Sequence, residues 1–200
     1  KTPWENINDY YKREKKVKTA VTYARKDLPR QNNLLSYLTQ LEDFINRAES
    51  ISDLEEIREE MVDNNLIKKK GNKKKKAKKS KPLHYKTNTG ADIYVGKNSK
   101  QNDYITLKLA RKEDLWFHVK DNPGSHVILK TDKIHNEDIE KAAYLAALNS
   151  SVSNDKKVDV DYTEKKNVNK AKGAKDGMVY YENFSTITVN LDTKIDLKKL

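Results

Sequence analysis

The stretch ADIYVGKNSKQNDYITLKLARKEDLWFHVKDNPGSHVIL, residues 91–129, decides the fold of the second half of this chain. Residues 93–95 alternate as a β-strand does, and Gly96 ends the run at a position where a positive φ would cost nothing. Apolar and polar residues alternate again over 115–119, Asn-Pro-Gly-Ser at 122–125 is typical of a turn, and 126–129 returns as a partner strand. The stretch therefore predicts an antiparallel hairpin whose two strands each carry a histidine.

Between these strands, residues 97–103 form a block of side chains that donate, accept or carry charge. We expect a loop here that contacts another molecule, followed by a new apolar alternation over 105–109. Asp103 is the member least suited to a phosphate because of its charge. We expect it to organise the loop by accepting backbone hydrogens.

The residues that follow predict the rest of this domain. Residues 136–149 predict a helix capped by Asn136, with small apolar side chains on the face that would lie against a sheet. Residues 158–162 predict a strand, and 178–181 with 187–189 predict a further hairpin. Several strands with one main helix indicate an α+β domain with a mainly antiparallel sheet.

The first 67 residues predict helices. Thr2, Pro3 and Glu5 form a capping-box pattern, and apolar residues recur at heptad spacing on both sides of Pro29. We therefore expect an antiparallel coiled-coil hairpin with its turn at or near Pro29. A short third helix follows, with Ser52 and Glu55 as its capping box and a buried face that comprises Leu54, Ile57, Met61 and Val62.

Charge is concentrated in one segment. Ten lysines and no acidic residue lie in 68–81, so nearly all of the net charge of +11 comes from this segment. Such a run repels itself and has nothing to bury, which predicts a flexible linker over 68–82 that either keeps the protein in solution or tethers it to phosphate. The domains expected are thus 1–67, the linker 68–82, and 83–200.

Composition narrows the function classes. The chain has no cysteine, which excludes disulfides, thiolate nucleophiles and cysteine-ligated zinc. It has neither an apolar run near the roughly 20 residues of a membrane span nor a signal-peptide pattern at its start. These features fit a reducing cytosol, and no cofactor is expected.

The block 165–177 holds five lysines and two glycines, which let ammonium groups and backbone approach a phosphate closely. A flexible surface loop is the plainer interpretation. His118 and His126 suggest a metal site, but spacing places no third ligand, so we expect none. Trp116 is suited either to stacking on an unpaired base or to a core.

Several of these blocks carry a family resemblance. IYVGKNSKQND, WFH before PGSH, and YTEKKNVNKAKGAKDGMV resemble the NFACT-R domain of the RqcH/NEMF (NFACT) ribosome quality control family, whose bacterial members were once described as fibronectin-binding protein A. NINDYYKREKK and DLEEIREE resemble the middle coiled-coil region of the same family. Asp176 stands where the family usually has proline.

The resemblance implies the C-terminal part of a factor that binds obstructed large ribosomal subunits and tRNA, alanyl-tRNA in bacteria, and supports template-free alanine tailing of stalled chains. It implies no catalytic residue, because the ribosome would form the peptide bonds. Ribosome contacts would lie at the hairpin tip, at Arg25, Lys26, Arg30 and Gln31. The residues expected to contact RNA are Lys97, Asn98, Lys100, Gln101, Asn102, Trp116, His118, Ser125, His126, Lys165, Lys166, Lys170, Lys172 and Lys175.

Two other functions stay open. An enzyme would use His118, His126 and Asp103 as general acid or base groups, although nothing in the sequence places a nucleophile or a substrate pocket. A cell-surface adhesin or a generic polyanion-binding module would rely on lysine attraction to acidic surfaces.

Overall fold

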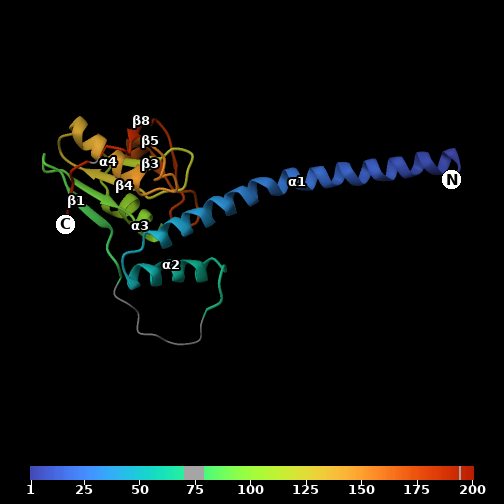
Figure 1. Ribbon diagram of the computed structural model, residues 1–200, viewed down its shortest axis with the longest axis horizontal. Helices are drawn as coiled ribbons and strands as arrows, with labels where there is room; N and C mark the ends of the chain where they lie inside the picture. Colours follow the sequence, from blue (N-terminus) through green and yellow to red (C-terminus); the bar gives the residue numbers. More distant parts are fainter. Residues whose placement is uncertain (70–78, 194) are drawn as a thin grey trace. The chain divides into compact units, whose positions relative to one another are not determined.

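The computed structural model of the chain describes residues 1–69, 79–193 and 195–200, and it divides into two compact units, Lys1–Leu38 and Thr39–Leu200 (Figure 1). The predicted lysine linker falls largely on 70–78, which lie outside the described residues. The division lies within helix α1 (Pro3–Asn46), so helix α2 (Ile51–Asp63) belongs to the second unit.

Helix α1 begins at the capping box that the sequence predicts. The Glu5 backbone N–H donates to Thr2 Oγ1 (3.3 Å), and the Thr2 N–H donates to a Glu5 carboxylate oxygen (2.7 Å). The helix then runs through Pro29 without a turn, in place of the expected antiparallel hairpin. Pro29 has no N–H to donate and so removes one backbone hydrogen bond, but the 44-residue helix continues on both sides of it. Arg25, Lys26, Arg30 and Gln31 consequently lie in mid-helix and not at a tip.

The second unit is built on a sheet of seven strands in the order β8-β5-β3-β4-β2-β1-β9, with every neighbouring pair antiparallel. This confirms the α+β class and the mainly antiparallel sheet. The strands are β1 (Leu83–Lys86), β2 (Asp92–Val95), β3 (Leu115–Val119), β4 (Val127–Lys130), β5 (Lys157–Glu164), β8 (Ser185–Asn190) and β9 (Lys198–Lys199).

Helix α4 (Asn136–Leu148) covers one face of the sheet (Figure 1). Its alanines at 142, 143, 146 and 147 are buried against Phe117, Val119 and Leu129, which confirms the small-residue face predicted for this helix. The residue at its N-cap is His135 and not Asn136, and no side chain caps it. Core alternation in β3 follows the prediction, since Leu115, Phe117 and Val119 all point to this face.

Two small elements cover the opposite face. Helix α3 (Ser99–Tyr104) continues into the π-helix η1 (Ile105–Leu109), and a two-stranded ribbon of β6 (Val168–Asn169) and β7 (Tyr180–Tyr181) lies beside them. Ile105, Trp116, Ile128 and Val168 form the core between these elements and the sheet. The apolar alternation over 105–109 therefore belongs to a helix and not to a strand.

The C-terminal strands also pair differently from the prediction. Residues 178–181 and 187–189 do not form one hairpin, because β7 pairs with β6 while β8 pairs with β5. Residues between them, around Asn183 at φ 52°, turn the chain from the ribbon to the sheet edge. A short 3₁₀-helix, η2 (Lys165–Asn167), connects β5 to β6.

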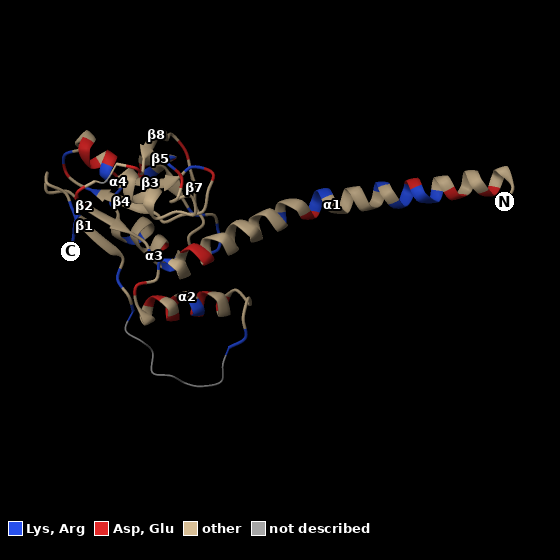
Figure 2. Cartoon of the chain, in the orientation of Figure 1, with Lys and Arg blue, Asp and Glu red and all other residues tan. Residues whose placement is uncertain are grey.

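Helix α2 starts two residues earlier than its predicted capping box. Its N-cap is Ser50, whose hydroxyl accepts the Asp53 N–H at 3.2 Å, and its buried residues are Asp53, Ile57 and Glu60. Leu54 is exposed. Six acidic residues and one arginine give this helix a strongly negative character (Figure 2).

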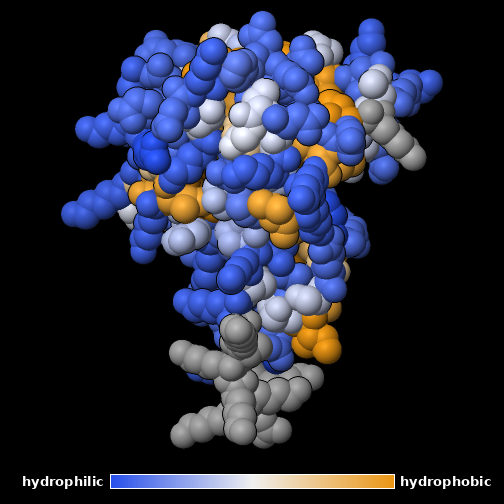
Figure 3. Space-filling view, turned by 90° about the vertical axis from the view of Figure 1, so that its left-hand side faces the viewer, coloured by the Kyte–Doolittle hydropathy of each residue, from blue (hydrophilic) through white to orange (hydrophobic). Residues whose placement is uncertain are grey.

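The face of the molecule in Figure 3 is mainly hydrophilic, with apolar side chains in small separate patches. Within the described ranges, no helix combines the length and the apolar composition that crossing a bilayer requires.

Candidate nucleic-acid interface

The polar block 97–103 is folded as a helix start and not as a loop. Asn98 has an extended backbone, and its Oδ1 accepts the Gln101 N–H at 2.9 Å, so it is the N-cap of α3. An asparagine before four helix-compatible residues is a recognised N-cap signal, which explains why this segment turns helical immediately after β2.

The same block contacts the acidic helix α2. Lys97 pairs with the buried carboxylate of Asp53, and Lys100 Nζ lies 2.9 Å from a carboxylate oxygen of Asp63. Glu56 accepts hydrogen bonds from the side-chain amides of Asn98 (2.7 Å) and Gln101 (3.2 Å). Four of the residues predicted to contact RNA thus use their polar groups within the protein.

Burial alone would raise the pKa of Asp53, but the Lys97 ammonium and the hydroxyls of Ser50 and Ser80 lower it below its ordinary value. The carboxylate is therefore charged, and it holds the Lys97 ammonium against α2. This pair fixes α2 on the start of α3.

Trp116, His118, Ser125 and His126 form the second predicted group, and the structure brings them close together beneath α3 and the ribbon. The Trp116 ring stacks on His118 at 5.6 Å between centroids and meets the edge of His126 at 5.2 Å. Trp116, Ser125 and His126 are buried. A base cannot reach a tryptophan ring that has no exposed surface, so Trp116 has a structural role here.

Asn102 links this cluster to the end of β2. Its Oδ1 accepts the His126 backbone N–H at 3.0 Å, and it lies against Gly96 so closely that a Cβ on Gly96 would be 2.1 Å from Oδ1. Gly96 does not have a positive φ, so the reason predicted for this glycine is wrong. Glycine is required here because Asn102 approaches the backbone.

Residues 165–177, which we call the lysine loop, run beside α3 and are anchored by one carboxylate. Val168 is buried in the core, and the other residues are at least partly exposed. The Gly177 backbone N–H donates to Asp103 Oδ1 at 3.0 Å, and the Lys170 ammonium pairs with the other oxygen of Asp103. Asp103 therefore accepts a backbone hydrogen as expected, but from the lysine loop and not from its own segment. Asp176, at the position where proline was expected, adds a carboxylate 3.3 Å from Lys170.

Lys170 is held within the loop by these carboxylates. Burial by itself would lower its pKa, but Asp103 and Asp176 raise it above the ordinary value. Lys166 pairs with Glu164. Lys165 and Lys172 have no ion pair with any described residue, so their charges are available to a partner.

Sequence reasoning missed several groups that join the lysine loop at the surface. The backbone N–H groups of Lys165 and Lys166 donate to the carbonyls of Asp114 (2.8 Å) and Lys112 (3.1 Å), so the Lys112 backbone lies beside the lysine loop, and the residue is exposed. Tyr180 and Phe184 on the ribbon side are 58% and 49% exposed. The signal in the sequence that could have identified Tyr180 and Phe184 is their position shortly after a lysine-rich segment.

This arrangement suits single-stranded nucleic acid. Ammonium groups on a loop bind phosphates, and exposed aromatic rings offer stacking faces to unpaired bases.

Within the described ranges there is no group of three His, Asp or Glu side chains that could hold a metal ion, and the His118 and His126 rings meet edge to face at 5.5 Å. Lys175, which is also among the residues predicted to contact RNA, lies in the lysine loop.

Comparison with known proteins bears on both parts of the chain. Residues 81–183 match the family model described as the NFACT protein RNA binding domain, and residues 1–80 match the NFACT N-terminal and middle domains. The chain is 37% identical over its whole length to the Rqc2 homolog RqcH of Bacillus subtilis, covering 36% of that protein. It is 36% identical over 96% of its length to the RqcH of Streptococcus pneumoniae, covering 35%.

A solved structure is also similar. It is described as the C-terminal part of the fibronectin/fibrinogen-binding protein from Streptococcus suis, with a TM-score of 0.78 and 35% identity over 95% of this chain and 76% of that one. The chain spans about a third of the length of the curated relatives that it matches.

Proposed function

The chain belongs to the NFACT family, and on this premise we propose that it is an RNA-binding, C-terminal part of a ribosome quality control factor. The observation that carries the proposal is the lysine loop. It lies in the segment that matches the RNA-binding domain, Asp103 holds its backbone in place, Lys172 is exposed and Lys165 is partly exposed.

The proposed binding mode combines charge with stacking. Lys112, Lys165 and Lys172 neutralise phosphates, and each contact releases counterions, so binding weakens as salt rises. Tyr180 and Phe184 stack on unpaired bases next to these phosphates. The residues of 97–102 support the interface from beneath, because their polar groups bind α2 and the buried cluster.

In the finer form of the proposal, the chain helps a full-length protein to bind a large ribosomal subunit that peptidyl-tRNA obstructs. It also helps to recruit tRNA, alanyl-tRNA in bacteria, for template-free alanine tailing of the stalled chain. The mid-helix group Arg25, Lys26, Arg30 and Gln31 contacts rRNA or ribosomal protein. The chain itself supplies no catalytic residue and works in the cytoplasm, where ribosomes are.

The name of the Streptococcus suis relative supports one alternative. That protein is described as binding fibronectin and fibrinogen, so an adhesin-like activity is the second candidate for this chain. A lysine-rich segment attracts acidic protein surfaces without a dedicated site, so such binding would depend on 68–81 and disappear at high salt.

The test is co-sedimentation of the chain with purified large subunits and with tRNA at several salt concentrations, beside a variant in which a Gly/Ser linker replaces 68–81. We expect both forms to bind subunits, and the Lys165→Gln, Lys172→Gln variant to bind at least several-fold more weakly. If all RNA binding disappears with the linker replacement, the proposal is wrong. Fibronectin binding by the original chain that disappears with the same replacement and at high salt would then support the alternative.

A further inference from the structure

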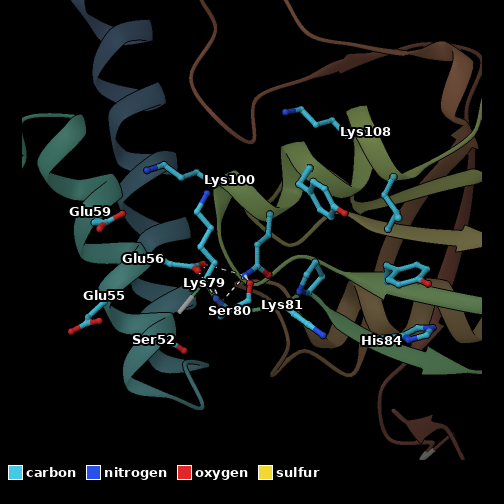
Figure 4. Close-up of a pocket in the computed structure, with 15 residues that line it drawn as sticks. Ser52, Glu55, Glu56, Glu59, Lys79, Ser80, Lys81, His84, Lys100 and Lys108 are labelled. Carbon is cyan, nitrogen blue, oxygen red and sulfur yellow. Dashed lines mark hydrogen bonds between the residues drawn. The ribbon is translucent and has the colours of Figure 1, made fainter. Parts of the chain in front are cut away.

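A pocket of about 840 Å³ lies between α2 and the side of the sheet domain that carries α3 (Figure 4). This volume is within the range of small-ligand sites and is large enough for one nucleotide. It is separate from the lysine loop. Its walls are of three kinds: aromatic on the sheet side, acidic on α2, and basic at the rim.

The aromatic wall offers flat faces. His84 and Tyr94 stack on each other at 4.4 Å with an interplanar angle of 7°, and the His84 Nε2 lies 2.8 Å from an Asp92 carboxylate oxygen, which fixes the imidazole. Tyr104, which is 48% exposed, lines the pocket from the end of α3. These rings suit a planar aromatic ligand.

The π-helix places a lysine beside Tyr104. Because η1 is wound more widely than an α-helix, Tyr104, Lys108 and Leu109 all line the pocket. Single π-turns within helices are frequent at functional sites. Lys108 and Lys81 at the rim form no ion pair with the part of the chain that the structure describes, so both can bind a phosphate.

The acidic wall on α2 limits which chemical groups a ligand can present to it. Glu56 is satisfied, since it accepts from the Ser80 backbone and hydroxyl, Asn98 and Gln101. Glu55 and Glu59 also line the pocket, but neither accepts a hydrogen bond from a described residue (Figure 4). A carboxylate only accepts, so a ligand that hydrogen-bonds to Glu55 or Glu59 must present N–H or O–H donors. A simple anion does not meet this requirement.

We propose that this pocket holds one unpaired RNA nucleotide whose base stacks at Tyr94 and Tyr104, donates to Glu55 or Glu59, and leaves its phosphate at Lys108 or Lys81. Guanine fits best, because its Watson–Crick edge presents two adjacent N–H donors to the two oxygens of one carboxylate. Uracil has no amino group and would direct carbonyl oxygens at the glutamates. This inference rests on the proposed RNA binding and adds base selection to it.

The test compares binding of the pentaribonucleotides UUGUU and UUUUU to the whole chain. We expect the wild type to bind UUGUU several-fold more tightly. Tyr104→Ala should weaken UUGUU about tenfold, the typical loss of one base–aromatic stack, whereas Tyr104→Phe keeps the ring and should bind like the wild type.

The decisive variant is Glu55→Gln, Glu59→Gln, because the two possible roles of these glutamates predict different changes in binding. If they read the base, their replacement removes the preference for UUGUU. If they only repel RNA, their loss strengthens both pentamers equally, since two negative charges are gone. Glu137→Gln, Glu140→Gln on α4, at the opposite face of the sheet, is the matched control and should leave the preference unchanged.

The outcomes separate this inference from the proposed function. If the wild type binds both pentamers equally, or if Tyr104→Ala has no effect while Lys165→Gln, Lys172→Gln weakens binding, the pocket proposal is overturned and the RNA-binding function stands. If the wild type binds no RNA of any kind, both are wrong.

Discussion

His126 holds three segments of the RNA-binding domain together. Its backbone accepts the Gly96 N–H at 3.1 Å and donates to Asn102, and its Nδ1 lies 2.8 Å from Thr106 Oγ1 in a buried hydrogen bond. The end of β2, α3 and η1 therefore meet at one residue, two of them through its backbone and η1 through its imidazole. Burial, with help from the nearby His118 and Lys170, holds the pKa of His126 well below its usual range, so the ring is neutral at pH 7.

This lowered pKa predicts a stability that falls in mild acid. The unfolded chain takes up a proton at its His126 near pH 6.5, whereas the folded chain resists this until lower pH. Full stability is therefore present above about pH 6.5 and decreases as the pH falls below it. We expect a lower denaturant midpoint at pH 5.5 than at pH 7.5, measured by circular dichroism.

The matching NMR experiment follows the His126 imidazole directly. Its signals should keep the neutral form at pH 6. A ring that titrates with a pKa near 6.5 in the folded protein would contradict the assignment of His126 as a buried structural group.

Gly96→Ala tests the close approach of Asn102. The added Cβ would lie 2.1 Å from Asn102 Oδ1 and 2.9 Å from its backbone N, so it must displace the side chain that binds His126. We expect a loss of about 3 kcal/mol in the free energy of unfolding. Gly173→Ala, at φ +81° with open space around it, should lose only about 1 kcal/mol by chemical denaturation. Equal losses would show that Asn102 moves freely.

Some residues that the sequence predicts at a contact surface are buried or bonded within the protein. Asn98, Gln101 and His126 read as contact residues because a single sequence displays polarity but not burial. The N-cap at Asn98 was visible in the sequence, but its Glu56 partner is 42 residues away. Lys166, Lys172 and Lys175 are exposed, since burying an ammonium group is costly, whereas Lys170 lies against Asp103 and Asp176.

Among the elements, the lysine loop depends on α3 for its conformation. Asp103→Ala removes both the oxygen that binds Lys170 and the oxygen that accepts the Gly177 N–H, and so should free that N–H. We expect the protection of this amide in hydrogen exchange to fall at least tenfold. Asp176→Asn removes an exposed acid that pairs with the same lysine and should leave the Gly177 amide protected. Similar exchange in both variants would mean that Asp103 is not the anchor.

The continuity of α1 through Pro29 also has a direct test. The chain has no cysteine, so cysteines introduced at Thr22 and Ser36 give unique spin-label sites. A continuous helix places these positions about 21 Å apart at 1.5 Å per residue, whereas a hairpin with its turn at Pro29 would place them within about 10 Å. Electron paramagnetic resonance distances should give the longer value. The shorter value would restore the hairpin.

Element prediction from the sequence succeeded where alternation was long and failed where tertiary contacts decide. Strand β3 and helix α4 were visible because their apolar spacing matches their periods. The helix α3 has only six residues and is stabilised by a cap and by α2, so its pattern read as a loop. The two-residue strand β6 left no periodic signal, and for this reason β7 was paired with the wrong strand.

At the scale of the whole molecule, positive charge lies both in segment 68–81 and on the lysine loop. Most of the net +11 lies in 68–81, yet the loop that the RNA-binding domain presents carries its own uncompensated cations. The central claim is that this folded surface, and not the linker alone, binds RNA. The two sources contribute separately to the salt dependence of binding, because each neutralised phosphate adds its own term.

The measurement that tests this claim most directly is the salt dependence of tRNA binding by Lys112→Gln, Lys165→Gln, Lys172→Gln. Its control, Lys133→Gln, Lys156→Gln, Lys157→Gln, removes the same charge at sites away from the lysine loop, with Lys157 at the opposite end of β5. We predict that the first variant reduces the slope of log K against log salt by about 2, while the control leaves it nearly unchanged. Equal changes in the two variants would show that only net charge matters and would contradict a binding site on the lysine loop.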